Sequence, residues 1–379
     1  MRATWCAWAA GPVAAALIVL GGAAAPAAAA GRTGVGVAAG CPWVGSTAPV
    51  EQRVSQLLAQ MTLDEKITMV HGGEPGTGKP FPWTGIIAGN PRLCIPELHL
   101  MDGPGGVGTG FGGVTQLPAP VAAAATWYTG LEGQYGSVVG AEVAGKGAQV
   151  NLGPTVNIVR DPRWGRAFET LGEDPYLSGR MGAAYINAVQ SNNVMSQVKH
   201  IAAYNQETHR NSPADNVIID ERTLQEIYLA QFHRTVTDAN VASMMCSYAM
   251  INGQFACENK NLLNQVLKGQ WGFTGFVTSD WFGTHSTATA ANNGLDMEQP
   301  DIDQFFAEPL KTAVMNGQVP QSRLDDMVRR ILREMFRFGI FDRPASGSPD
   351  TVVTNPQHAA VARTVAAAGL LTLLRKAAS

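Results

Sequence analysis

Side chains that could do chemistry recur in this sequence at the ends of short apolar stretches that are typical of buried strands. These positions are Asp102, Lys199-His200, Tyr248, Asp280 and Glu298. A charge at the end of a buried strand is costly unless it is used. A fixed carboxylate can attack an electrophilic carbon, and it can also accept hydrogen bonds from hydroxyl groups.

The stretch Gly275 to Trp281 offers the most informative of these carboxylates. Its apolar part runs from Phe276 to Thr278, and Asp280 follows after one small polar residue. We predict that Asp280 is a catalytic carboxylate acting as a nucleophile. The alternative is a helix N-cap, which is the commoner role for an aspartate after a strand.

Strands and helices are predicted to alternate along the chain. The predicted strands cover residues 95–101, 149–152, 194–198, 241–245, 276–278 and 295–298. The predicted helices cover residues 49–61, 131–146, 176–190, 220–237, 262–268, 302–315 and 322–337, and a capping box at Thr62 to Glu65 opens one more short helix. This alternation indicates a parallel sheet.

Reactive side chains at the C-terminal ends of strands favour an α/β fold of the TIM type. We predict a (β/α)8-like barrel with its active site at the C-terminal face. A doubly wound open sheet is the alternative, and it usually carries a Gly-rich phosphate loop. The stretch Gly103-Pro-Gly-Gly106 does not have that pattern.

Several segments occur together in the order and at the spacing of a known family. They are Asp102-Gly-Pro, Arg160-Asp-Pro-Arg-Trp-Gly-Arg166, Phe168 to Tyr176, Lys199-His200 with Asn205-Gln-Glu207, Met245-Cys-Ser-Tyr248 and Ser279-Asp-Trp281. The chain resembles glycoside hydrolase family 3, β-glucosidase type, over roughly residues 48–375. The resemblance is to the N-terminal barrel domain, and the run from Asp161 to Tyr176 is its most specific part.

The resemblance implies roles for individual residues. Asp280 matches the family's nucleophile, which forms a covalent glycosyl-enzyme ester. The implied substrate-binding residues are Asp102, Arg166, Lys199, His200, Met245, Tyr248 and Trp281.

Several of these matches have a plainer structural alternative. Asp102 could form a turn before Gly-Pro, and His200 could be a core histidine bonded to backbone. Arg166 could be a strut to Glu169 or Asp174, and Met245 could simply pack in the core. The family often has an arginine shortly after the Asp-Gly-Pro turn, where this chain has Gly-Val-Gly.

A retaining glycosidase also needs a second carboxyl group as acid/base, about 5–5.5 Å from the nucleophile. Glu169, Glu173, Glu207 and Glu298 stand near the motifs, but the resemblance implies that none has this role. In β-glucosidase-type members the acid/base comes from a second, C-terminal α/β domain. We therefore expect residues 346–379 to be a linker and the start of a truncated second domain. His209 lies near the Lys-His pair but outside the pattern of the family's histidine-based alternative.

The function implied is a retaining exo-β-glycosidase that releases terminal β-D-glucosyl residues from a β-glucoside or oligosaccharide. No metal or organic cofactor is implied. A β-xylosidase on the same scaffold is one alternative. A catalytically weak sugar-binding barrel fragment is the other.

The N-terminal residues 1–30 resemble a secretory signal peptide. Arg2 supplies a basic end, Val13 to Leu20 an apolar stretch, and Ala23 to Ala30 small residues for cleavage. A transmembrane helix or a non-exported Ala-rich leader is less favoured. We expect a secreted, extracellular protein with a linker at 31–47 and the barrel at 48–345.

Export permits disulfides, and four of the five cysteines remain once Cys6 leaves with the signal. Cys246 and Cys257 flank a turn-like Asn-Gly pair, so a hairpin could join them. Cys41 then pairs with Cys94 by elimination. The sequence contains no CxxC pair and no His cluster that would indicate a metal site.

Length and charge exclude some classes of partner. The 379 residues are 45% hydrophobic, which allows a large core, and the formal net charge is −3 without a long run of one sign. Neither nucleic acid nor a membrane surface is an expected partner, and no stretch after the signal could span a bilayer. The oligomeric state does not follow from the sequence.

Overall fold

The computed structural model describes residues 40–73, 83–108, 110–300, 305–343 and 346–377, with side chains described as far as Leu370. The predicted signal segment, residues 1–30, and most of the predicted linker lie outside these residues. The last part of that linker packs on the barrel: Trp43 is buried, and its indole N–H donates to the Leu93 carbonyl at 3.0 Å.

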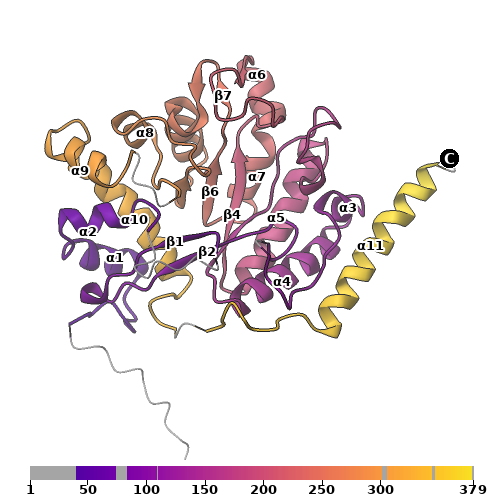
Figure 1. The fold of residues 1–379 in the computed structure, drawn as a ribbon, viewed down its shortest axis with the longest axis horizontal. Coiled ribbons are helices and arrows are strands. Elements are labelled where there is room, and N and C mark those ends of the chain that lie inside the picture. The colour runs from indigo at the N-terminus through magenta and orange to yellow at the C-terminus, as the bar shows by residue number, and fades with distance from the viewer. Residues whose placement is uncertain (1–39, 74–82, 109, 301–304, 344–345, 378–379) are drawn as a thin grey trace, which may run out of the picture. The chain divides into compact units, whose positions relative to one another are not determined.

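Six strands form the main sheet in the order β1-β2-β3-β4-β6-β9, surrounded by helices (Figure 1). They are β1 (Gly85–Ile87), β2 (Leu98–Asp102), β3 (Val150–Leu152), β4 (Met195–Ile201), β6 (Ser243–Cys246) and β9 (Phe276–Thr278). Neighbouring strands are parallel, except that β1 is antiparallel to β2.

Two further segments close this sheet into a ring. Thr278 of β9 bridges in parallel to Met297, and the adjacent Glu298 bridges to His71. Gly73 then donates a backbone hydrogen bond of 2.8 Å to Ile86 of β1. The predicted TIM-type barrel is confirmed, with one antiparallel strand. The predicted strand at 295–298 contributes only isolated bridges.

The helices return the chain between the strands. They are α1 (Val50–Leu58), α2 (Leu63–Thr68), α3 (Pro120–Ala124), α4 (Thr129–Gly145), α5 (Pro175–Ser191), α6 (Glu221–Thr223), α7 (Ala230–Thr237), α8 (Ala288–Asn293), α9 (Glu308–Met315), α10 (Gln321–Arg337) and α11 (Pro356–Ala377). Short 3₁₀ or π segments are η1 (Pro91–Leu93), η2 (Ala167–Glu169), η3 (Leu224–Tyr228), η4 (Ala256–Glu258) and η5 (Asn261–Gln270).

Apolar spacing and small residues explain how these helices pack. In α10, Leu324, Val328, Ile331 and Met335 recur every three or four residues, and all four are buried. Helices α4 and α5 pack closely because Gly136 lacks a side chain. A Cβ there would lie 2.6 Å from the Tyr185 carbonyl oxygen.

Capping residues in the sequence predict where some helices start, but the sequence pattern does not predict the π segments that interrupt or replace others. The capping box at Thr62 is formed as predicted. The Asp220 side chain accepts from the Thr223 N–H at 3.0 Å, but the predicted helix 220–237 is divided by the π segment η3. The predicted helix 262–268 is π-helical. Of the predicted helix 302–315, residues 302–304 lie outside the described residues, and α9 begins at Glu308. Propensity alone does not distinguish π from α segments, because the difference lies in which carbonyl each N–H reaches.

Besides two disulfides, the described residues contain a small second sheet. Strands β5 (Asn216–Val217), β7 (Met250–Ile251) and β8 (Gln254–Phe255) form it. Asn252 and Gly253 join β7 to β8 with φ values of 51° and 87°, as a tight hairpin turn requires. Disulfides join Cys246 to Cys257 and Cys41 to Cys94, the two predicted pairings.

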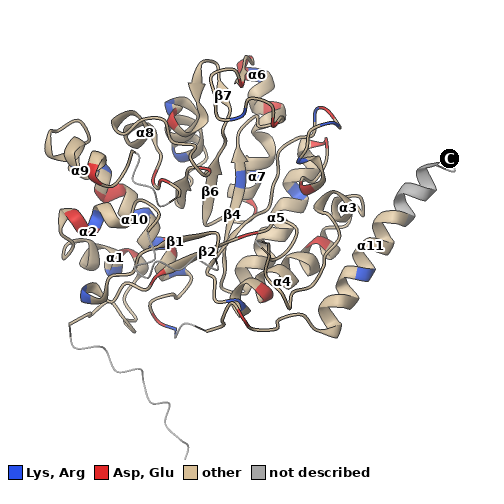
Figure 2. Cartoon of the chain, in the orientation of Figure 1, with Lys and Arg blue, Asp and Glu red and all other residues tan. Residues whose placement is uncertain are grey.

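The segment after residue 346 packs against the barrel. Lys146, only 1% exposed, donates to the carbonyls of Gly112, Pro349 and Thr351 and so fixes this segment. Helix α11 then runs beside α3 and α4, with Val365 fully buried. No helix in the described ranges is both long and apolar enough to cross a membrane. Figure 2 shows the positions of basic and acidic residues interspersed along the helices.

Candidate active site

The parallel strands bring the predicted residues to the C-terminal edge of the barrel. Asp102 is the last residue of β2, and Asp280 lies two residues beyond β9. Lys199 and His200 lie within β4 rather than after it, because this strand extends to Ile201. Four of the predicted groups thus come from the same edge of one sheet, although up to 178 residues separate them in the chain.

Asp280 is buried at this edge of the barrel. Its residue is 7% exposed, and its Oδ1 accepts the Trp281 backbone N–H at 2.7 Å. Its Oδ2 is buried without a hydrogen-bond partner among the described residues. Burial raises the pKa of Asp280, and the positive charges of Lys199 and Arg166 offset part of that rise.

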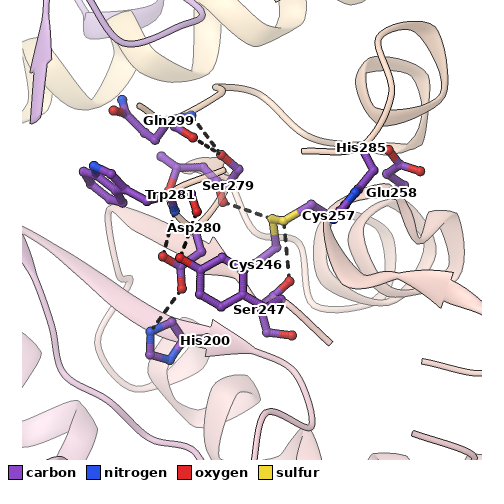
Figure 3. The surroundings of a disulfide bond; sticks show 12 residues. His200, Cys246, Ser247, Cys257, Glu258, Ser279, Asp280, Trp281, His285 and Gln299 are labelled. Carbon is purple, nitrogen blue, oxygen red and sulfur yellow. Dashed lines mark hydrogen bonds and ion pairs between the residues drawn. A yellow bond between two sulfur atoms is a disulfide. The ribbon is translucent and has the colours of Figure 1, made fainter. Parts of the chain in front are cut away.

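His200 faces this free oxygen. Its Nε2 lies 3.5 Å from Asp280 Oδ2 (Figure 3). The same Nε2 lies 3.2 Å from an Arg166 guanidinium nitrogen. Burial, followed by the charges of Arg166 and Lys199, holds the pKa of His200 well below its usual range. The imidazole is therefore neutral at physiological pH and forms no ion pair with Asp280.

Asp102 and Lys199 form an ion pair in the site. Lys199 Nζ donates to Asp102 Oδ1 at 2.9 Å, and the side chains are 5% and 44% exposed, respectively. Burial opposes ionisation of Asp102, but the charge and hydrogen bond of Lys199, the charge of Arg166 and the Gly103 N–H together outweigh it and lower the pKa of Asp102. Asp102 keeps an exposed face, so a ligand hydroxyl can donate to it.

Arg166 joins the site to the loop after β3. It pairs with Glu169 Oε1 at 2.6 Å while it contacts His200, so the structural strut and the site contact occur together. Asp174 instead caps α5 through the Leu177 N–H. The two predicted roles of Arg166, structural support and site residue, do not exclude each other, because one guanidinium has five N–H donors.

Tyr248 and Trp281 form an aromatic side of the site. The Tyr248 hydroxyl donates to the Trp281 carbonyl at 2.8 Å, and the half-buried Trp281 ring packs over Gly85 of β1. Met245 lies in β6, is 1% exposed and belongs to the main core. Its position fits core packing, the plainer of its two predicted roles.

Sequence reasoning missed several residues that support the site. Tyr204 packs edge-on against His200 and Tyr248, with ring centroids 5.2 and 5.8 Å away. Its hydroxyl donates to Glu207 Oε2 at 2.8 Å, and Arg210 pairs with the same oxygen at 2.7 Å. The motif Asn205-Gln-Glu207 lies next to Tyr204 and could have pointed to it.

The described residues contain no group of three or more His, Cys, Asp or Glu side chains arranged to hold a metal. The fold and the site together define an α/β barrel with a site centred on carboxylates. A buried aspartate, an Asp–Lys pair and aromatic rings are grouped at the C-terminal ends of its strands.

Comparison with known proteins identifies the family. The model of the glycosyl hydrolase family 3 N-terminal domain matches residues 87–334. A β-glucosidase of Rhizobium radiobacter is 39% identical over 325 residues, covering 84% of this chain and 38% of the relative. The chain therefore belongs to glycoside hydrolase family 3.

Solved structures of β-glucosidases share the fold. One from Streptomyces venezuelae, in complex with D-glucose, is 39% identical with a TM-score of 0.75, covering 84% of this chain and 41% of that one. The β-D-glucoside glucohydrolase of Trichoderma reesei is 36% identical with a TM-score of 0.78, covering 86% and 45%. This chain thus spans less than half the length of these relatives.

Proposed function

We propose that this chain carries the nucleophile and the sugar-binding residues of a secreted, retaining exo-β-glucosidase. The observation that carries this proposal is Asp280 Oδ2, a buried carboxylate oxygen with no hydrogen-bond partner in the described residues, at the open edge of the barrel. An oxygen that accepts no hydrogen bond keeps its electron pair available for attack on carbon.

In the proposed reaction, Asp280 attacks the anomeric carbon of a terminal glucosyl residue and forms a glycosyl ester. The bond to the leaving oxygen breaks, and water later releases the sugar with net retention. Asp102 accepts hydroxyl hydrogens, while Lys199 and Arg166 donate to sugar oxygens. Trp281 offers an apolar face to the C–H bonds of the ring.

The substrate class is argued from the relatives. Proteins named β-glucosidases match more than four-fifths of this chain, and one was solved with D-glucose. A β-xyloside remains the competing substrate, since the contacts that would exclude a hydroxymethyl group are not among those described.

We propose that the proton for the leaving group comes from outside the described residues. Glu169 and Glu207 are engaged by Arg166 and Arg210, and Glu298 accepts the Phe306 N–H at 2.5 Å. Loss of a general acid typically costs about 10²–10⁴ in rate. Substrates with good leaving groups need that proton least.

The test uses the purified chain, a 2,4-dinitrophenyl 2-deoxy-2-fluoro-β-glucoside and intact-mass analysis. We expect one fluoroglucosyl adduct, mapped by peptide digestion to Asp280. The variant Asp280→Asn should take up none, whereas the surface variant Asp238→Asn should label like the parent. A folded chain that takes up no label, or that labels elsewhere, would refute the proposed nucleophile.

Leaving-group dependence tests the missing proton donor. We expect 2,4-dinitrophenyl β-glucoside to be hydrolysed at least about 100-fold faster than cellobiose, and faster than the matching β-xyloside. Equal rates on cellobiose and the activated glucoside would contradict the external donor. A preference for the xyloside would replace the glucosidase proposal by the xylosidase alternative.

Secretion is tested separately by expressing the full chain in a Sec-competent bacterial host. We expect the protein in the exported fraction, with a new N-terminus near Ala30 by mass spectrometry. An uncleaved protein retained in the cytoplasm would contradict export without affecting the catalytic proposal.

A further inference from the structure

The side chain of Asn157, in the loop after β3, is bonded to His200 at three points. Asn157 Oδ1 accepts the His200 backbone N–H at 2.7 Å, and Asn157 Nδ2 donates to the His200 carbonyl at 2.9 Å. Asn157 Oδ1 also lies 3.1 Å from His200 Nδ1. Asn157 is 1% exposed, so water cannot replace these bonds.

The two backbone bonds fix the orientation of the amide. A backbone N–H can only donate and a backbone carbonyl can only accept. The oxygen of the Asn157 amide must therefore face the N–H, which is also the side of the imidazole Nδ1. Because an amide oxygen only accepts, Nδ1 must carry the imidazole proton.

We propose that Asn157 is a positioning residue that sets the tautomer of His200 and keeps its Nε2 unprotonated and facing Asp280. This inference rests on the proposed function of Asp280 and adds to it the acceptor character of His200. The Arg166 guanidinium, 3.2 Å away, donates to the same Nε2.

The consequence concerns the space between His200 and Asp280. Nε2 and Oδ2 are both acceptors, 3.5 Å apart, with no proton of their own to share. His200 therefore cannot donate to Asp280 and does not consume its free oxygen. A sugar hydroxyl can donate to Nε2, so the tautomer favours ligands that present a donor at this point.

The chemistry also explains why an asparagine suits this position better than an aspartate. An aspartate at 157 would lose the bond to the His200 carbonyl, and its charge would favour the imidazolium. Protonated His200 would then form an ion pair with Asp280 and occupy its free oxygen. The other titratable or charged groups facing His200 are Arg166, Lys199, Arg210 and Tyr204, and the three cations oppose that protonation.

A direct test measures the tautomer by long-range ¹H–¹⁵N correlation spectra of ¹⁵N-histidine-labelled protein, with His200 assigned by the variant His200→Gln. We expect a protonated Nδ1 and a bare Nε2 between pH 6 and 8. A protonated Nε2, or an imidazolium, in that range would overturn the proposal. This readout does not need activity, so it can fail or succeed independently of the proposed glucosidase function.

A kinetic test compares Asn157→Asp with Asn205→Asp, which adds the same charge to a neighbouring loop without a bond to His200. We expect the acidic limb of kcat/KM on the activated glucoside to move up by about 1–3 pH units in Asn157→Asp, and less in Asn205→Asp. A loss of rate that is equal at all pH values would indicate a merely structural role and would overturn the assignment. If Asn157→Asp does not fold, the spectra of the parent protein still decide the tautomer.

Discussion

Asp280 and Asp296 are both buried beside the same strand, β9, but their carboxyl groups differ in how many partners bind them. Asp296 has no exposed surface, and its carboxylate accepts from Lys268 Nζ at 2.7 Å on both oxygens. Arg323 and the Val277 N–H add bonds of 2.7 and 2.8 Å. Asp280 Oδ1 accepts the Trp281 N–H, and Asp280 Oδ2 has no hydrogen-bond partner among the residues that the structure describes.

The pKa directions follow from this difference in bonding. Burial opposes ionisation of Asp296, but Lys268 and Arg323 outweigh it and lower the pKa of Asp296. At Asp280 burial dominates, and the pKa is raised. Two carboxyl groups that are both buried therefore shift their pKa values in opposite directions, according to whether charged partners satisfy them.

The largest expected effect is the loss of activity in a variant of Asp280. Asp280→Asn should lower kcat on 2,4-dinitrophenyl β-glucoside by roughly 10⁴-fold or more, because it removes the proposed nucleophile. Its circular dichroism spectrum should match the parent. Retention of more than a tenth of the parent rate would remove the distinction between the two sites.

For stability, we expect the substitution of Asp296 to be the damaging one. Asp296→Asn leaves Lys268 without its full counter-charge and should lower the free energy of unfolding by about 3–5 kcal/mol. Urea unfolding followed by tryptophan fluorescence measures this. The surface control Asp238→Asn, which loses exposed ion pairs with Arg234 and Arg180, should cost at most about 1 kcal/mol. Equal costs for both variants would show that the buried cluster is not stabilising.

The lysine partners extend the comparison. Lys199→Met should lower kcat/KM by roughly 10- to 150-fold, the equivalent of about 1.5–3 kcal/mol for a charge-assisted hydrogen bond. Its stability should change little, because Asp102 retains contact with water. Lys268→Met should do the reverse and destabilise the fold. Stability losses of the same size in both variants would contradict the proposed division of roles.

The smallest effect is a gain in stability. Asp280→Asn should raise the free energy of unfolding by about 1 kcal/mol at neutral pH, because it removes an under-bonded buried charge. Asp280 has a folded-state pKa above its ordinary value of 3.8, so its favourable contribution is present below that value and is lost as pH rises through the folded pKa. The advantage of the variant should therefore grow from pH 4 to pH 7.

Asp296 should show the opposite pH dependence. Its folded-state pKa lies below 3.8, so its contribution is present above that pH and is lost as the pH falls through the folded pKa. The gap between parent and Asp296→Asn should narrow below about pH 4. Urea titrations of the three proteins between pH 3 and 7 measure both trends. If the free energy of unfolding of the three proteins changed with pH in parallel, the pKa of neither aspartate would change on folding.

Sequence reasoning recovered the barrel because its signals are local. Periodic apolar residues mark α10, and an Asn-Gly turn marks the hairpin that carries Cys257. It failed where an element depends on its neighbours. The segment at 295–298 reads as a strand but makes only bridges, and η3 interrupts a helix that looked continuous.

In the candidate site, too, local sequence patterns indicate some residues, whereas the roles of others depend on distant partners. Asp280 and the Lys199-His200 pair were visible because each follows an apolar run in a specific motif order. Asp296 was not singled out, and Asn157 was missed, because their roles lie in bonds to residues at least 19 positions away. Glu298 was noticed as a polar strand end, yet its carboxylate accepts the N–H groups of Phe305 and Phe306.

The order of residues by itself determined the type of fold, the disulfide partners and the aspartate proposed as nucleophile, since these depend on short-range pattern and motif spacing. Only the tertiary structure decided which buried charges are satisfied and which oxygen is left free. The physical reason is that a hydrogen bond depends on atoms within about 3 Å. Chain folding, rather than proximity in sequence, brings Asn157 Oδ1 to 3.1 Å from His200 Nδ1 and leaves His200 Nε2 3.5 Å from Asp280 Oδ2.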